Sequence, residues 1–96
     1  MCGAQIGGPD LATLKPGETA IQGQVTKGGE PISGYVRLLD GGGEFTAEVP
    51  TSATGQFRFY AAPGTWTLRA LVPGAQADRA VVVAEAGGVT DVAIAV

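Results

Sequence analysis

The single cysteine, Cys2, has the clearest capacity for covalent chemistry in this chain of 96 residues. Removal of Met1, which is expected before so small a residue, leaves a cysteine whose amine and thiol can act together as a ligand or a nucleophile. A neighbouring ammonium favours the thiolate, which is the reactive form of cysteine. Two interpretations follow: an exposed thiol without a role, or a candidate sulfur acceptor that carries a persulfide or a mixed disulfide.

Three arginines are the next candidates. Arg37, Arg58 and Arg69 alternate with apolar residues in three different segments, so each is expected on the polar side of a strand. If two of these strands are neighbours, the guanidinium groups form a row with Glu48 on an outer sheet face. The alternative interpretation is a candidate partner-binding face, because guanidinium groups bind carboxylates through paired hydrogen bonds.

Two other groups of residues favour structural interpretations. Asp40, Glu44 and Glu48 supply three carboxylates, whereas Ca²⁺ takes about six to eight oxygen ligands. The run of glycines at 41–43 is followed by a strand pattern, and a phosphate loop requires a helix there. The sequence therefore predicts no metal site and no cofactor.

The overall composition narrows the function classes. The chain has no histidine, which excludes Ser-His-Asp and Cys-His nucleophile pairs and all histidine metal ligands, so we predict a protein that is not an enzyme. A hydrolase that uses carboxylates stays as a minor alternative, and it would need an acidic residue in a deep pocket.

The charge and the termini narrow the partners. The net charge is −3, the pI is about 4.6 and no Lys/Arg cluster occurs, so we expect no nucleic-acid partner. No apolar run approaches the roughly 18 residues of a membrane span, and we expect no membrane partner. A lone cysteine cannot form an intramolecular disulfide and residues 1–9 show no secretory pattern, which favours the cytoplasm.

The elements that position these residues are predicted to be strands. Sixteen Gly and six Pro leave only residues 75–86 as twelve consecutive positions free of both, and that window centres on three valines. Elsewhere apolar residues alternate with period two, as in half-buried strands. In one such segment Phe45, Ala47 and Val49 are expected to share a face. The predicted strands are residues 19–26, 34–39, 44–49, 56–60, 65–72, the region of Val81–Val83, and 89–96.

Seven short strands between Gly/Pro turns predict an all-β fold, a seven-stranded antiparallel β-sandwich. Residues 19–96 are expected to form this single domain. Residues 1–18 show no periodicity and contain several Gly and Pro, so we expect a flexible N-terminal arm.

Two stretches resemble a known scaffold. They are Gly55-Gln56-Phe57-Arg58-Phe59 and Pro63-Gly64-Thr65-Trp66-Thr67-Leu68-Arg69-Ala70. Their pattern is similar to that of carboxypeptidase-regulatory-like and transthyretin-like sandwich domains, which implies the fold but no chemistry. Transthyretin-like hydrolases rely on histidines, so the absence of histidine excludes that activity.

A second resemblance is more specific. It is carried by Gly34-Tyr35-Val36-Arg37-Leu38-Leu39-Asp40, Glu44-Phe45-Thr46-Ala47-Glu48-Val49, residues 52–55 and 61–71, and the Met1-Cys2 start. The chain is thereby similar to the small actinobacterial SseC-like family of unknown function. Its members are typically encoded beside thiosulfate sulfurtransferases of the rhodanese type, which implies a role in sulfur metabolism, and no catalytic residue is established for it.

These observations lead to two hypotheses. The first is a non-enzymatic accessory or binding module that works with a thiosulfate sulfurtransferase, with Cys2 accepting sulfane sulfur and Arg37, Arg58 and Arg69 forming the partner-binding face. The second is a structural interaction module without a sulfur role, which forms a homo-oligomer or binds another chain through exposed strand edges.

Overall fold

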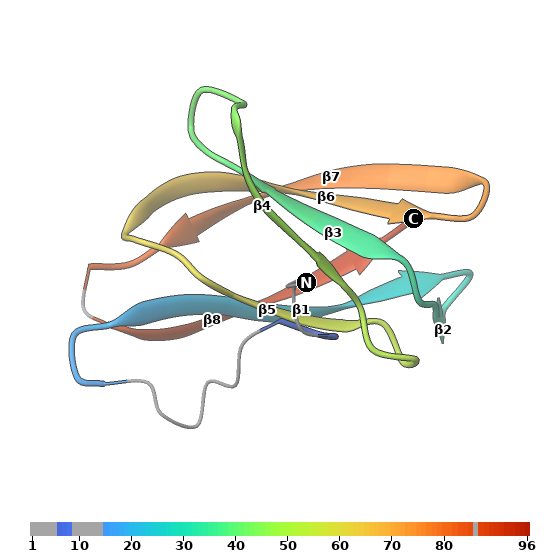
Figure 1. Ribbon diagram of the computed structural model, residues 1–96, viewed down its shortest axis with the longest axis horizontal. Coiled ribbons are helices and arrows are strands. Elements are labelled where there is room, and N and C mark those ends of the chain that lie inside the picture. Colours follow the sequence, from blue (N-terminus) through green and yellow to red (C-terminus); the bar gives the residue numbers. More distant parts are fainter. Residues whose placement is uncertain (1–5, 9–14, 86) are drawn as a thin grey trace.

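Two β-sheets stacked face to face form the protein (Figure 1). The structure is a computed structural model that describes residues 6–8, 15–85 and 87–96, and within these residues no helix occurs. The predicted all-β sandwich is confirmed, with eight strands in place of seven. The strands are β1 (Thr19–Lys27), β2 (Glu30–Pro31), β3 (Tyr35–Leu39), β4 (Phe45–Pro50), β5 (Gln56–Tyr60), β6 (Gly64–Val72), β7 (Ala75–Val83) and β8 (Gly88–Ala95).

The first sheet, called here the β1 sheet, is built around β1. This strand pairs with β2 and β5 antiparallel and with β8 parallel. The second, called the β3 sheet, has the order β4-β3-β6-β7 and is antiparallel throughout. The predicted antiparallel arrangement therefore holds for every pair except β1–β8, because the chain crosses from the β3 sheet back to the β1 sheet before its last strand.

The extra strand is the short β2, in which Glu30 and Pro31 pair with the end of β1. Strand β7 is nine residues long and lies within the window 75–86, where the valines predict a strand. It begins directly after Pro73 and Gly74, and the positive φ of Gly74, 77°, allows β6 to turn tightly into β7.

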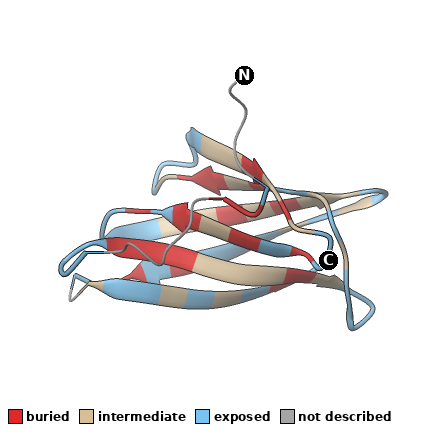
Figure 2. Cartoon of the chain, turned by 60° about the horizontal axis from the view of Figure 1, so that its bottom comes forward, coloured by how far each residue is buried: buried red, intermediate tan, exposed pale blue. Residues whose placement is uncertain are grey.

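Buried residues recur along the strands of both sheets (Figure 2), and their side chains form the core between the layers. The rings of Phe57 and Phe59 both enter this core, with centroids 6.2 Å apart. The largest fully buried side chains are Phe57, Ile21, Leu38, Leu68, Ile94, Val25 and Val36. These residues occupy alternate positions of their strands, as the period-two pattern predicts.

Phe45 departs from the prediction. Leu38 pairs with Ala47 as expected, but Leu39 pairs with Phe45, so Thr46 is an extra residue on β4. A bulge of one residue turns every side chain beyond it to the opposite face. Phe45 consequently lies outside the core and is 61% exposed.

Part of the predicted N-terminal arm packs on the sandwich. Gly7 and Gly8 are buried, and the Gly7 N–H donates a hydrogen bond of 2.7 Å to the Pro50 carbonyl of β4. Gly8 lies against Arg58 of β5, so close that a Cβ atom there would overlap the Arg58 carbonyl oxygen. Residues 6–8 therefore contact both sheets, while residues 1–5 and 9–14 lie outside the described residues.

Candidate functional site

A line of four charged residues crosses the outer face of the β3 sheet, the face directed away from the β1 sheet. The strand register places Glu48 of β4 opposite Arg37 of β3, Arg37 opposite Arg69 of β6, and Arg69 opposite Asp78 of β7. Alternation keeps these residues on the face opposite the buried Val36 and Leu38. We call this line, with charges − + + −, the charged row.

Each arginine of the charged row is bound to the carboxylate on its outer side. Arg37 Nε donates to Glu48 Oε1 at 2.6 Å, while Arg69 donates from Nε and Nη2 to the two oxygens of Asp78 at 2.9 and 3.1 Å. The hydrogen bond from Arg69 lowers the pKa of Asp78 below its ordinary value, and the same bond raises the pKa of Arg69.

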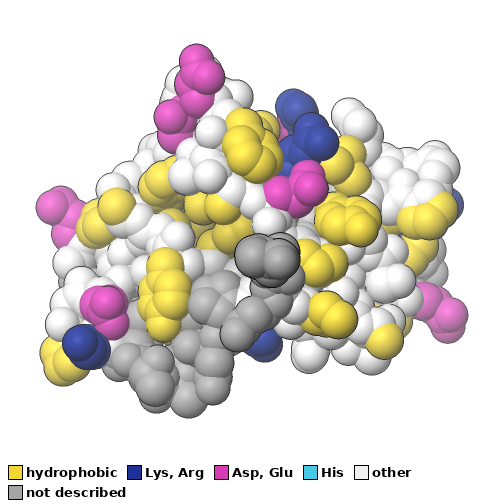
Figure 3. All heavy atoms as spheres, viewed as in Figure 1, with side chains coloured by type: hydrophobic (Ala, Val, Ile, Leu, Met, Phe, Trp, Pro, Cys, Tyr) yellow, Lys and Arg dark blue, Asp and Glu magenta, His cyan; other side chains and the backbone are white. Residues whose placement is uncertain are grey.

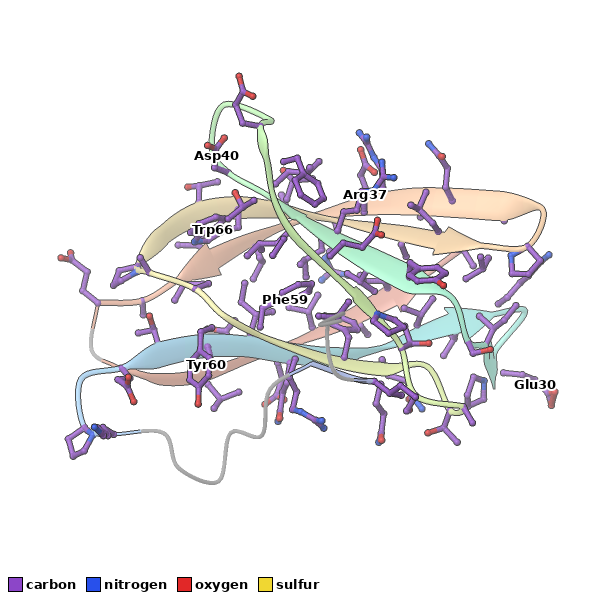
Figure 4. The ribbon with its side chains drawn as sticks, in the orientation of Figure 1. Glu30, Arg37, Asp40, Phe59, Tyr60 and Trp66 are labelled. Carbon is purple, nitrogen blue, oxygen red and sulfur yellow. The ribbon has the colours of Figure 1, made fainter. Side chains whose placement is uncertain are left out.

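The middle of the charged row brings two like charges together. Arg37 and Arg69 are directly opposite on neighbouring strands, an arrangement that is unfavourable on its own. Their side chains remain 43% and 35% exposed. In Figure 4 the Arg37 side chain points away from the β1 sheet, whereas Phe59 lies between the layers. The centre of this face is therefore positively charged and open to solvent.

Exposed apolar side chains surround the charged row. Tyr35 and Leu71 are opposite each other two residues from the arginines, and Phe45 and Val82 lie on the same outer face beyond the row. Tyr35 is 52% exposed and Val82 is 69% exposed. Figure 3 shows basic and acidic side chains next to hydrophobic ones in this part of the surface. We call the charged row together with Tyr35, Phe45 and Val82 the docking face.

The three predicted arginines do not lie together. Arg37 and Arg69 are neighbours and Arg37 pairs with Glu48, as the first interpretation expected. Arg58 lies on β5 of the other sheet, where its Nη2 donates to the Gly8 carbonyl at 3.4 Å. Two of the three predicted arginines therefore share a sheet face. Cys2 lies outside the described residues.

Sequence reasoning missed the other members of the docking face. Phe45 was hidden by the bulge, and Asp78 lies in the part of β7 that precedes the valines, where the period-two signal is weak. Tyr35 and Val82 carried a usable signal, because each is an apolar residue at a position that alternation assigns to the outer face.

The other outer face, on the β1 sheet, carries a hollow of about 570 Å³. Its outward-facing lining side chains are Gln22, Gln24, Gln56, Arg58 and Asp91. Gln22 donates to Asp91 at 2.7 Å and Gln24 donates to the Thr54 carbonyl at 2.9 Å, so the amide groups of these two residues are bound within the protein.

The candidate carboxylates for a metal site were Asp40, Glu44 and Glu48. Asp40 Oδ1 accepts hydrogen bonds from the backbone N–H groups of Gly42 and Glu44, which closes the loop between β3 and β4. Glu48 belongs to the charged row. Within residues 6–8, 15–85 and 87–96, no three His, Cys, Asp or Glu side chains gather in a group that could hold a metal ion.

These features define a small β-sandwich domain with a mixed apolar and charged outer face. The chain belongs to the DUF1416 family, described as a protein of unknown function, whose family model matches residues 2–96.

Relatives in mycobacteria support this membership. The chain is 66% identical over 56 residues to an uncharacterized protein of Mycolicibacterium smegmatis, a match that covers 56% of this chain and 62% of that protein. It is 56% identical over 72 residues to the uncharacterized proteins Rv0814c and Rv3118 of Mycobacterium tuberculosis, which covers 73% of this chain and 72% of each. The chain thus spans less than two thirds of the first of these relatives.

A solved structure supports the fold. The sandwich is similar to the dioxygenase domain of a dioxygenase carbohydrate-binding protein fusion from Streptomyces sp. SirexAA-E, with a TM-score of 0.64, 12% identity, and coverage of 88% of this chain and 82% of that chain. At this identity the likeness concerns the fold alone. Among the described residues, no helix has the length and apolar character needed to cross a membrane.

Proposed function

We propose that the protein is a cytoplasmic, non-enzymatic binding module that docks a partner protein on the docking face. The observation that carries this proposal is the combination, on one sheet face, of two half-buried arginines with the exposed side chains of Tyr35, Phe45 and Val82. Aromatic residues and arginine are the residue types enriched in the cores of protein interfaces. A surface in which such residues adjoin one another is typical of a protein-binding site.

The bulge in β4 strengthens the proposal. If β4 continued without the bulge, with Thr46 paired opposite Leu39, alternation would direct Phe45 into the core with Ala47 and Val49. Its position instead leaves a phenyl ring in solvent, which is unfavourable for the isolated chain by the hydrophobic effect. Burial of this ring against a partner would recover that free energy.

The resemblance to the SseC-like family supplies the partner class, a thiosulfate sulfurtransferase of the rhodanese type. In the full proposal, Cys2 accepts sulfane sulfur from the docked enzyme. The Cys2 thiolate attacks the terminal sulfur of the enzyme's cysteine persulfide, and a new S–S bond forms on Cys2. The S–S bond of the enzyme breaks and its cysteine leaves as a thiolate, so the step requires no external oxidant or reductant.

Binding to a thiosulfate sulfurtransferase of the rhodanese type tests the docking face. We expect Phe45→Ser and Val82→Ser each to weaken the association by about tenfold or more, as for central interface residues. The matched control is Val89→Ser, because Val89 is also exposed but lies on β8 of the other sheet. Equal affinities for all variants would show that the partner binds elsewhere, and no association at all would remove the sulfurtransferase from the proposal.

Sulfur transfer is tested separately by mass spectrometry. After incubation with thiosulfate and the sulfurtransferase, the protein is expected to gain one sulfur atom at Cys2. The Cys2→Ser variant should gain none and should still bind the enzyme, because the docking face is intact. If the wild-type protein gains no sulfur, transfer to Cys2 is excluded. The binding function would then be decided by the affinity measurements alone.

A further inference from the structure

We propose that Arg37 and Arg69 together bind one carboxylate of the partner protein, at the centre of the docking face. This inference rests on the proposed function, since it names the chemical group that the docking face recognises.

The geometry leaves donors free at the centre of the charged row. Glu48 accepts from Nε of Arg37, and Asp78 accepts from Nε and Nη2 of Arg69. Among the described residues, the hydrogen bonds of these two arginines to acidic side chains involve no other nitrogen, so both Nη groups of Arg37 and Nη1 of Arg69 can donate elsewhere. Because the two residues are directly opposite on adjacent strands, one acceptor can reach donors from both.

The order of charges favours an external anion. Both carboxylates stand on the outer sides of the row, and no described acidic residue separates Arg37 from Arg69 in the register. A glutamine at either position would remove the repulsion between the guanidinium groups without burying a polar group. Glu48 and Asp78 each account for one arginine but do not separate the two guanidinium groups, whereas a shared carboxylate would relieve their repulsion and gain charge-assisted hydrogen bonds.

The surroundings indicate that this carboxylate belongs to a protein. An inorganic anion held by the arginines would leave the exposed side chains of Tyr35, Phe45 and Val82 in water. A second copy of the protein, packed on this face and centred on the charged row, would place its own two arginines against Arg37 and Arg69. An acidic side chain flanked by apolar residues matches both the positive centre and the apolar surroundings.

Affinity for the sulfurtransferase tests the inference in the full-length protein. We expect Arg37→Gln and Arg69→Gln each to weaken binding by about tenfold and to reduce its dependence on salt concentration. Lys27→Gln is the matched control, because it removes the same charge at the exposed end of β1 and should change the affinity less than about twofold. If Phe45→Ser weakens binding and both arginine variants bind like the control, the docking face stands and the carboxylate inference is wrong.

Nuclear magnetic resonance of the arginine side chains provides a test that does not depend on the sulfurtransferase. The Nε–Hε signals of Arg37 and Arg69 should both shift on addition of the peptide N-acetyl-Leu-Glu-Leu-amide, and the matching Gln peptide should leave them in place. Unmoved signals with the Glu peptide would overturn the inference. A larger shift of these signals with sodium sulfate than with the Glu peptide would also overturn it, because that result indicates an inorganic anion site. Shifts that follow the protein concentration alone would overturn it as well, because they indicate binding of a second copy.

Discussion

In the charged row, Arg37 and Arg69 lie side by side and repel each other. The carboxylates of Glu48 and Asp78 determine how much of that repulsion remains. Exposed ion pairs contribute little to stability because water and salt screen them. Their larger effect is on orientation: Asp78 holds the guanidinium group of Arg69 through two hydrogen bonds, and Glu48 holds Arg37 through one. A preordered guanidinium group loses less conformational entropy when it binds a partner.

The Arg69–Asp78 pair makes a prediction about acid titration. The pKa of Asp78 is lowered from its ordinary value of 3.8, first by the hydrogen bond from Arg69. Since the folded-state pKa lies below the unfolded one, the pair stabilises the fold above the unfolded pKa, and this contribution disappears as the pH falls through the folded pKa. The ¹³C signal of the Asp78 carboxyl should therefore titrate with a midpoint below 3.8.

The control for this titration is Arg69→Gln, which should return the midpoint of Asp78 to the ordinary range. High salt should also raise the wild-type midpoint toward the ordinary range, because salt screens an exposed ion pair. Identical midpoints in the wild type and Arg69→Gln would show that the hydrogen bond does not form in solution.

At the level of the strands, the sequence predicts the core better than it predicts the outer face. Period two identified Ile21, Val36 and Phe57 because each strand has one buried side, and burial fixes which residues alternate inward. The same argument fails where chain geometry changes locally. The bulge at Thr46 is not visible in the pattern, and the parallel pairing of β1 with β8 depends on contacts between the two ends of the domain.

The early part of β7 gives a weaker signal than its valines. Its inward residues Ala75 and Ala77 are small, so they give a weak hydrophobic signal next to Gln76 and Asp78. Cys2 illustrates the opposite case: its chemistry is evident from its residue type, but only a structure that describes its surroundings can place it. The candidate site was therefore predicted in part, through Arg37, Arg69 and Glu48.

The edges of the sandwich bear on the second hypothesis, pairing through exposed strands. Arg79 of β7 is opposite the buried Leu68, so alternation directs it toward the β1 sheet. Its Nη1 donates to the Ala93 carbonyl of β8 at 2.9 Å and thereby links the free edges of the two sheets. Inward-pointing charges on edge strands are a common protection against pairing with another chain. Oligomerisation through edges stays a prediction, and this contact argues against it at β7 and β8.

Replacement of Arg79 tests this protection. We expect Arg79→Thr to increase self-association, because threonine suits a strand and leaves the edges of β7 and β8 without a bridging charge. Sedimentation velocity at increasing protein concentration measures the effect. Lys27→Thr, which removes a positive charge at an exposed position, should sediment like the wild type. A wild-type protein that is already dimeric, with Arg79→Thr monomeric, would instead make Arg79 part of an interface.

Considered as a whole, the sandwich is joined at two opposite sides. Arg79 links β7 to β8, and residues 6–8 link β4 to β5 through Pro50 and Arg58. The second link is relevant to function because β4 also carries Glu48 and Phe45 of the docking face. The N-terminal segment therefore packs on the strand that supplies one side of the proposed interface.

Glycine substitutions test whether residues 6–8 hold the sheets together. Gly8 and Gly17 have similar positive φ angles, 91° and 86°, so an alanine at either position carries a similar backbone cost of about 1–3 kcal/mol. A Cβ at Gly17 would meet no atom within 4 Å, whereas a Cβ at Gly8 would overlap the backbone of Arg58. The free energy of unfolding in urea should thus fall further in Gly8→Ala than in Gly17→Ala.

Hydrogen exchange locates the difference between the two variants. The Gly7 amide, which donates to Pro50, should exchange faster in Gly8→Ala because the segment can no longer lie against β5. In Gly17→Ala its protection should change only as far as global stability changes. If the two variants unfold at the same urea concentration and protect Gly7 equally, then residues 6–8 do not join the sheets in solution, and the two layers depend on the core and on Arg79 alone.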